Sequence, residues 1–191
     1  MDNRSSAQQQ KESLAPKTLK LIHQGRIISC YEETLTFPEE KKAFDVVKHP
    51  GAVAILAIDE KENLVLIKQW RRTVEEILIE IPAGTLEKGE DPYHCAQREL
   101  REETGFRANS LTLLGGFYTA PGFCNEYIHL FLAKDLIHDP LQAEDSDDID
   151  LYLIPLQTAF SLSQQGKIKD CKTLSALFLY IQQQIKLKIL L

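Results

Sequence analysis

Three glutamates lie within five consecutive residues near the middle of the chain, at Glu99, Glu102 and Glu103. On a helix with about 3.6 residues per turn, residues three and four apart share one face. Like charges at this spacing destabilise a helix by roughly 0.2–0.5 kcal/mol per pair, and acidic residues near its carboxyl end also oppose the helix dipole. Local stability therefore does not explain the arrangement. A hard divalent cation does, because it takes several oxygen ligands and removes the repulsion.

A solvated helix face with Arg–Glu pairs is the alternative interpretation. Arg98 lies four residues before Glu102, and Arg101 is also close in sequence. The residues before the helix favour the metal site, because a glycine-containing loop leads into it and Glu90 stands at its entrance.

The helix that carries these glutamates has clear start and stop signals. Asp91 is a good N-cap, and Pro92 suits the first helical position. Gly105 is the usual residue for a left-handed end. The sequence predicts a helix over 92–104 that packs Tyr93, Ala96 and Leu100 on a sheet.

The surrounding segments predict the sheet. Apolar or β-rich runs indicate strands at 51–58, 64–70, 77–84, 111–119, 126–134 and 149–156, and 64–70 is expected to form a hairpin with 51–58. Helical spacing of apolar residues follows over 156–165 and from Thr173 to about Lys188. This order of strands, helix, strands and helices favours an α/β (α+β) fold, with a mixed sheet covered by helices.

Composition limits the partners and the compartment. The 191 residues carry a formal charge of −6, which argues against nucleic acid as a bulk partner because phosphate binding needs clustered Lys and Arg. No apolar run is long enough to cross a bilayer, and the polar amino terminus lacks the apolar region of a secretory signal. The four cysteines form no CxxC pair. We therefore expect a cytoplasmic protein with no membrane partner.

Residues 84–106 resemble the Nudix box, the signature of the Nudix hydrolase superfamily. The matching positions are Gly84, Glu90, Arg98, Glu99, Leu100, Glu102, Glu103, Gly105 and Phe106, and every defined position of the motif is filled. The order of elements from about residue 50 to 190 also looks like the Nudix fold. The resemblance implies a Nudix-type α/β/α sandwich with a mixed sheet and an N-terminal β-rich arm.

The same resemblance implies a hydrolase that uses Mg²⁺ or Mn²⁺ to cleave a nucleoside diphosphate linked to another group. By this carry-over Glu99 and Glu103 are metal ligands, and Glu102 assists directly or through water. Arg98 orients the carboxylates, and the backbone carbonyl of Ala83 is a further ligand. Metal ions at such a site can neutralise a pyrophosphate and activate water for attack on phosphorus.

Segments outside the box resemble the ADP-ribose pyrophosphatase group. They include "HPGAVAIL", "LIKQWR", "EIPAG", "KDCKT" and Pro121, sixteen residues after Gly105. The match implies that Arg71 contacts the diphosphate or nucleoside and that Glu126 faces the ribose or a metal. ADP-ribose, cleaved to AMP and ribose 5-phosphate, is the expected substrate.

The acidic loop at 139–148 is expected to supply the general base. In the resembling group a carboxylate after the last pair of core strands has this role. The loop offers Glu144, Asp145, Asp147 and Asp148, and the approximate alignment favours Asp145 with Glu144 beside it. A solvated charged loop is the alternative for each of them.

One departure from the group keeps other functions open. The group commonly has Arg-Glu before its "HPGAV" segment, where this chain has Ala43-Phe44. Another nucleoside diphosphate sugar, a nucleoside triphosphate or a non-catalytic nucleotide-binding role therefore stay as alternatives. His49, His94 and His129 have no obvious relay partner in the sequence.

The amino-terminal third predicts an arm. Residues 1–17 are rich in Ser, Gln and Lys and are expected to be disordered, and 18–48 form a β-rich arm before the hydrolase domain at 49–191. A short sheet of this kind exposes its edges, which pairing with a second copy would cover. The resembling pyrophosphatases are homodimers, so we expect a homodimer built through the arm.

Overall fold

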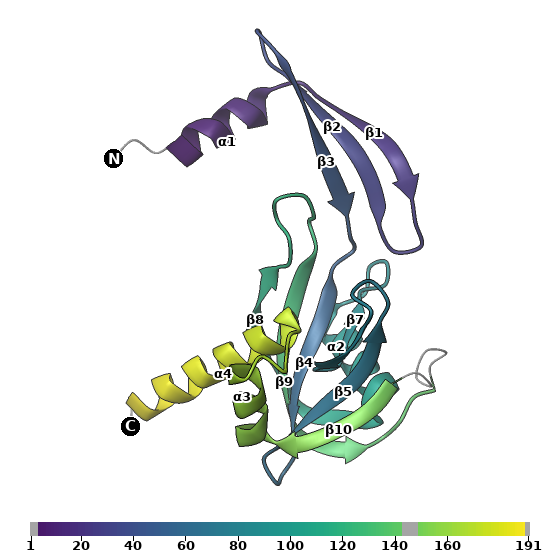
Figure 1. Cartoon of the computed structure of the whole chain (residues 1–191), viewed down its shortest axis with the longest axis vertical. Coiled ribbons are helices and arrows are strands. Elements are labelled where there is room, and N and C mark those ends of the chain that lie inside the picture. The colour runs from purple at the N-terminus through teal and green to yellow at the C-terminus, as the bar shows by residue number, and fades with distance from the viewer. Residues whose placement is uncertain (1–3, 143–148, 190–191) are drawn as a thin grey trace. The chain divides into compact units, whose positions relative to one another are not determined.

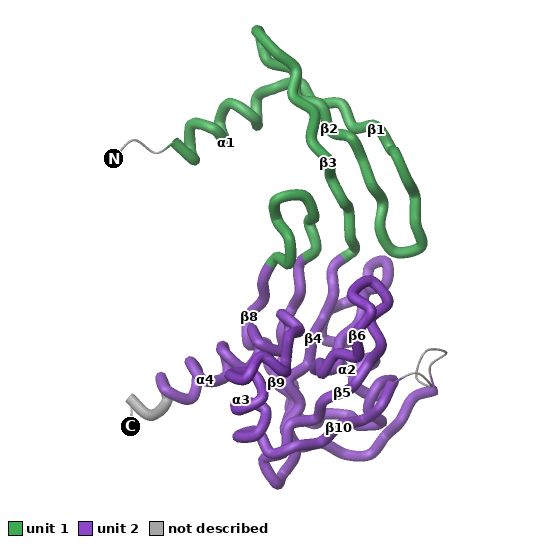
Figure 2. The backbone as a smooth tube through the Cα atoms, in the orientation of Figure 1, with its two compact units in different colours: residues 1–50, 118–126 green, residues 51–117, 127–191 purple. Residues whose placement is uncertain are grey.

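The computed structural model describes residues 4–142 and 149–189. The chain divides into two compact units, residues 1–50 with 118–126 and residues 51–117 with 127–191 (Figure 2). The predicted loop base residues Glu144 and Asp145 lie outside the described residues. No helix in the described part of the chain is both long and apolar enough to cross a membrane.

The first unit is an antiparallel sheet preceded by a helix (Figure 1). Its elements are α1 (Arg4–Leu14), β1 (Lys17–Gln24), β2 (Ser29–Thr36) and β3 (Lys41–Lys48). The turn between β1 and β2 closes where the N–H of Gly25 donates to the carbonyl of Ile28 at 2.8 Å. Every residue of β1 is exposed, including the apolar Leu19, Leu21 and Ile22.

Helix α1 differs from the sequence expectation of a disordered tail. The segment contains alanine, glutamines, lysine and glutamate, all good helix formers. None of its residues is buried. The composition that indicated disorder is therefore also compatible with a solvent-exposed helix. Helix propensity, rather than burial, supports this helix.

The second unit is built on a mixed sheet with helices on both faces. The strand order is β10-β5-β4-β9-β8, with β6 paired to β5 and β7 to β4. Its elements are β4 (Ala52–Ile58), β5 (Asn63–Arg71), β6 (Glu76–Glu80), β7 (Ala83–Thr85), α2 (Pro92–Thr104), β8 (Phe106–Tyr118), β9 (Tyr127–His138), β10 (Ile149–Pro155), α3 (Leu156–Gln164) and α4 (Cys171–Ile189). This confirms the predicted α/β/α arrangement with a mixed sheet.

Strand β4 explains its own continuous apolar sequence. All seven of its residues are buried. Ala54 and Leu56 pack in the core under α3 and α4, whereas Val53 and Ile55 pack in the core under α2. A strand covered on both faces has no place for polar residues.

The predicted hairpin between β4 and β5 is short. The two strands pair only through Ala57↔Val65 and Ile58↔Leu64. Beyond this point β5 pairs with β6 and β10, while β4 pairs in parallel with β9 and antiparallel with β7. The strand predicted at 77–84 is likewise divided into β6 and β7. Pro82 lies between them, has no N–H to donate, and accepts from the N–H of Ile55 at 2.8 Å.

Candidate active site

Helix α2 begins and ends where the sequence predicted. The Asp91 carboxylate accepts hydrogen bonds from the N–H groups of Tyr93 and His94, and Pro92 is the first helical residue. Gly105 has φ 75° and donates its N–H to the carbonyl of Arg101. These caps fix the first and the last residue of the helix, and therefore which side chains share one face.

One face of α2 is buried against the sheet. Cys95, Ala96 and Leu100 are fully buried and pack with Val53 and Ile55 of β4. Tyr93 was expected on this face, but it is 41% exposed and contacts Phe131 in a T-shaped, edge-to-face arrangement. The acidic residues therefore lie at the border of the buried face, next to β7.

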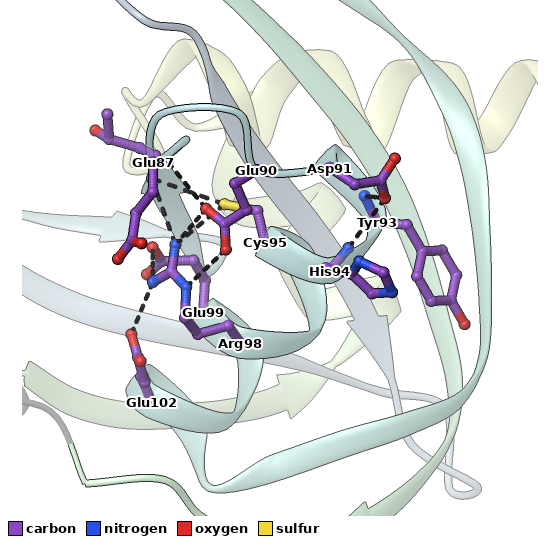
Figure 3. Close-up of polar contacts among 10 residues, drawn as sticks. Glu87, Glu90, Asp91, Tyr93, His94, Cys95, Arg98, Glu99 and Glu102 are labelled. Atoms are coloured by element: carbon purple, nitrogen blue, oxygen red, sulfur yellow. Dashed lines mark hydrogen bonds and ion pairs between the residues drawn. The ribbon is translucent and has the colours of Figure 1, made fainter.

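The Arg98 guanidinium lies between three carboxylates (Figure 3). Its Nε and Nη2 each donate to Glu90 at 2.9 Å, and its Nη1 donates to Glu99 at 2.6 Å and to Glu102 at 3.1 Å. The hydrogen bonds from Arg98 lower the pKa of Glu90 to about 2. We call Glu90, Arg98, Glu99, Glu102 and Glu103 the carboxylate cluster.

Glycine is required at position 84 by the carboxyl group of Glu99. A Cβ placed on Gly84 would lie 1.8 Å from Cδ of Glu99 and 2.0 Å from its Oε1. Gly84 pairs with Val53 across the β4–β7 ladder, so its backbone is held in the sheet. The missing side chain leaves the space that the carboxylate occupies.

Glu103 points to the strand before the helix. Its Oε2 accepts a hydrogen bond from the N–H of Ala83 at 2.9 Å. Burial, with the neighbouring charge of Glu99, raises the pKa of Glu103 to about 8, although the hydrogen bond from Ala83 opposes the shift. Burial also raises the pKa of Glu99, although Arg98 opposes the shift. Glu99 and Glu103 are thus two desolvated carboxyl groups beside the β7 backbone, and the nearby arginines do not fully offset the effect of burial on their pKa values.

The chemistry of this cluster fits a hard divalent cation. The candidate ligand atoms are all oxygen, from Glu99, Glu102 and Glu103 of the cluster and from the Ala83 backbone carbonyl, which is the ligand type that Mg²⁺ and Mn²⁺ prefer. Within the ranges that the structure describes, no three acidic, histidine or cysteine side chains already form a ready metal site. In this structure the positive charge between Glu99 and Glu102 is that of Arg98.

A second charged group lies at the end of β5 and was not predicted as such. The Arg71 side chain, expected to bind substrate, donates from Nε and Nη2 to Glu80 at 2.6 Å each. Glu80 is only 1% exposed, and it also accepts from Lys172 at 2.8 Å. The sequence did not predict the contact between Glu80 and Lys172 of the "KDCKT" segment. The signal for it was Glu80 itself, because a charged residue within the apolar run 77–84 needs a buried partner.

Glu126 belongs to the other compact unit. Its Oε2 accepts from the Thr119 hydroxyl at 2.7 Å, and its Oε1 lies 3.6 Å from Nε2 of His49. His49, for which the sequence shows no obvious relay partner, therefore lies beside a carboxylate that is distant in sequence. The acidic loop residues are outside the described ranges, so their role stays a prediction.

Comparisons with known proteins agree with this geometry. Residues 48–174 match the NUDIX domain. The chain is 39% identical over 171 residues to an ADP-ribose pyrophosphatase from Bacillus subtilis (strain 168), covering 87% of this chain and 92% of that protein. It is 38% identical over 178 residues to a methanol dehydrogenase activator from Bacillus methanolicus, covering 90% and 96%.

The fold has a solved counterpart as well. A crystal structure of an ADP compounds hydrolase superposes with a TM-score of 0.77 at 24% identity, covering 90% of this chain and 93% of that one. The NUDIX match spans more than half of the chain and includes every residue of the carboxylate cluster. This chain belongs to the Nudix family.

Proposed function

We propose that this chain is a divalent-metal-dependent hydrolase of nucleoside diphosphate sugars, and that ADP-ribose is its substrate. The observation that carries the proposal is the carboxylate cluster held by Arg98 beside Gly84. Water would attack one phosphorus and the P–O bond to the bridging oxygen would break, giving AMP and ribose 5-phosphate. The similarity to a protein named ADP-ribose pyrophosphatase supports this substrate class.

The cluster residues have distinct roles in the proposed reaction. Glu99, Glu103 and the Ala83 carbonyl would hold Mg²⁺ or Mn²⁺, with Glu102 assisting. The bound ion supplies positive charge to the diphosphate oxygens. Arg98 keeps the carboxylates together through its ion pairs with Glu99 and Glu102. It thereby holds the ligands near their working positions before any cation binds.

Substrate contacts would come from outside the cluster. Arg71 is proposed to contact the diphosphate, because its side chain is 37% exposed while its fork is fixed on Glu80. Glu126 is proposed to face the ribose or a metal. The three alternatives are another nucleoside diphosphate sugar, a nucleoside triphosphate, and nucleotide binding without catalysis. The complete set of box glutamates disfavours the last of these.

A substrate screen with product identification tests the function. ADP-ribose, GDP-mannose and a nucleoside triphosphate should be offered with Mg²⁺, with Mn²⁺ and with a chelator. We expect metal-dependent release of AMP and ribose 5-phosphate from ADP-ribose. Equal rates with chelator present, or no hydrolysis of any substrate, would reject the proposal.

The variant E103Q tests the metal assignment. It keeps the shape of the side chain but removes a charged oxygen ligand, so turnover should fall on the order of a hundredfold or more while the fold survives. Mg²⁺ should raise the melting temperature of wild type more than that of E103Q. The exposed Glu60 provides the control variant E60Q. Near wild-type turnover of E103Q at saturating Mg²⁺ would remove Glu103 from the site.

The acidic loop is proposed to take the proton from the attacking water, with Asp145 as the base and Glu144 beside it. A general base acts in the transition state, so D145N should lower kcat more than it changes KM. The loss should be smaller than that of E103Q and should depend on the substrate. Steady-state kinetics of D145N and E144Q would check this. Wild-type rates in both variants would exclude the loop from the mechanism.

The arm is proposed to form a homodimer. Strand β1 leaves Leu19, Leu21 and Ile22 exposed by 47%, 51% and 57%. A second copy of the chain would cover this surface in a two-fold pairing, the commonest symmetry of soluble oligomers. The active site would then depend on both chains.

A further inference from the structure

A buried carboxylate holds the guanidinium of Arg71. Glu80 is the last residue of β6, two residues before Pro82, and its side chain is almost fully buried from solvent. It receives both Nε and Nη2 of Arg71, the two-point geometry in which an arginine fork loses most of its freedom. The Nη1 group donates to no described residue, and the Arg71 side chain remains 37% exposed. Arg71 is thus fixed on one side and accessible on the other.

Lys172 holds Glu80 from the other direction. Its Nζ donates to Oε2 of Glu80 at 2.8 Å and to Oδ1 of Asp170 at 2.6 Å. The Lys172 side chain is only 15% exposed. Two cations and two carboxylates therefore form one neutral network, in which burial opposes the charge on Glu80 but Arg71 and Lys172 keep its pKa low.

The amino end of α4 fixes this network to the strand. Asp170 precedes the helix, and its Oδ2 accepts from both the N–H and the hydroxyl of Thr173. The same hydroxyl oxygen accepts from the N–H of Ile81 at 2.9 Å. The helix cap is therefore bonded directly to the segment between β6 and β7.

That segment leads to the carboxylate cluster. Ala83 follows two residues after Ile81, and its N–H donates to Glu103. Glu80, which holds Arg71, and Ala83, which bonds Glu103, are only three residues apart in the chain. This short connection places the Arg71–Glu80 pair close to the carboxylate cluster, where the diphosphate is proposed to bind.

We propose that Lys172 is a positioning residue for the hydrolase reaction: by holding Glu80 together with Asp170, it directs the Arg71 guanidinium to the substrate diphosphate. This inference rests on the proposed function. Without Lys172, Glu80 keeps a single cationic partner and Asp170 loses its ion pair. Glu80 can then take other side-chain positions, and Arg71 follows it away from the diphosphate.

The test measures binding as well as catalysis. Titration calorimetry in Mg²⁺ with the α,β-methylene analogue of ADP-ribose reports affinity without turnover, and AMP serves as the ligand that lacks a diphosphate. The variants are R71Q, K172M and D170N. The control is K169M. Lys169 lies three residues before Lys172 and forms an exposed ion pair with Glu76.

We expect K172M to weaken binding of the analogue about tenfold, the size of one misdirected charge-assisted contact, and to raise KM with kcat changed about twofold or less. AMP binding and K169M should stay at wild-type levels. D170N retains the helix cap, because Asn also caps well, but loses the charge that holds Lys172. It should shift analogue affinity in the same direction by a smaller factor, and it decides the question if K172M fails to fold.

The outcomes separate the two proposals. Wild-type affinity of R71Q for the analogue would remove Arg71 from the substrate site and so reject part of the proposed function. Weak binding by R71Q with normal binding by K172M or D170N would reject the positioning role alone. Equal loss of analogue and AMP binding in K172M would show a general structural effect and would also overturn the inference.

Discussion

At the scale of single residues, the candidate site depends on the missing side chain of Gly84 and on the guanidinium of Arg98. Gly84 leaves the space for the Glu99 carboxylate, and Arg98 balances three carboxylates that would otherwise repel each other. Neither effect stabilises the core. The residues of the cluster are therefore expected to separate loss of activity from loss of stability.

The variant G84A should show this separation. The three atoms nearest to the added methyl group all belong to the end of the flexible Glu99 side chain, so Glu99 can move and the free energy of unfolding should change by about 1 kcal/mol or less. The displaced carboxylate should lower kcat/KM about 100-fold, since misplacement by about 1 Å has effects of this size. Denaturant unfolding and steady-state kinetics measure the two quantities.

Gly166 provides the opposite control. It has φ 68° at the end of α3, and a Cβ there would meet no atom within 4 Å. G166A should cost about 1 kcal/mol through backbone strain and leave turnover unchanged. A G84A enzyme with wild-type kinetics would show that the Glu99 position is not critical.

At the scale of elements, the caps of α2 help to position the carboxylate cluster that the helix carries. Asp91 bonds the first turn, and the same helix carries Glu99, Glu102 and Glu103 about two to three turns later. A frayed start changes the loop that holds Glu90, whose carboxylate also accepts from the N–H of Glu87. The cap therefore acts on both stability and cluster geometry.

The variant D91A should lower the free energy of unfolding by about 0.5–2 kcal/mol, the usual cost of losing an N-cap. D91S retains a capping oxygen and should stay within a few tenths of a kcal/mol of wild type. Thermal or denaturant unfolding of both variants provides the measurement. If D91A and D91S are equally stable, the hydrogen bonds from Tyr93 and His94 contribute nothing.

The elements also show what sequence alone can predict. Helix α2 was predicted to the residue, because its caps and its charge spacing are local signals. The network around Glu80 was not, because Lys172 lies on a helix far along the chain and only the fold brings them together. The division into β6 and β7 was also missed, since an apolar run does not show which neighbour each residue pairs with.

At the scale of the whole molecule, the open question is assembly. The three strands of the first unit have their own sheet, and β1 is exposed along its full length. Three-stranded sheets need an apolar face covered to be stable. The proposed homodimer provides that cover. Helix α1 buries none of its own residues.

Two truncations test the dimer. Removal of residues 1–16 takes away α1 but leaves all three strands, so a dimeric, active enzyme is expected. Removal of residues 1–46 deletes most of the sheet and should give a monomer or an aggregate. KM should rise about tenfold or more if, as proposed, the partner chain contributes to the pocket. Light scattering and kinetics on both proteins decide it. A fully active monomer lacking 1–46 would contradict the proposal.

The parallel pairing of β4 with β9 has a consequence for folding kinetics. Its register joins Ala52 to Ile128, and the whole carboxylate cluster lies in the sequence between them. Closing a loop of this length costs about 4 kcal/mol of chain entropy, which must be overcome before the central pair can form. Such non-local sheets fold slowly, in the range of about milliseconds to seconds. The apolar β4 is therefore exposed early in folding, and refolding yield should depend on protein concentration.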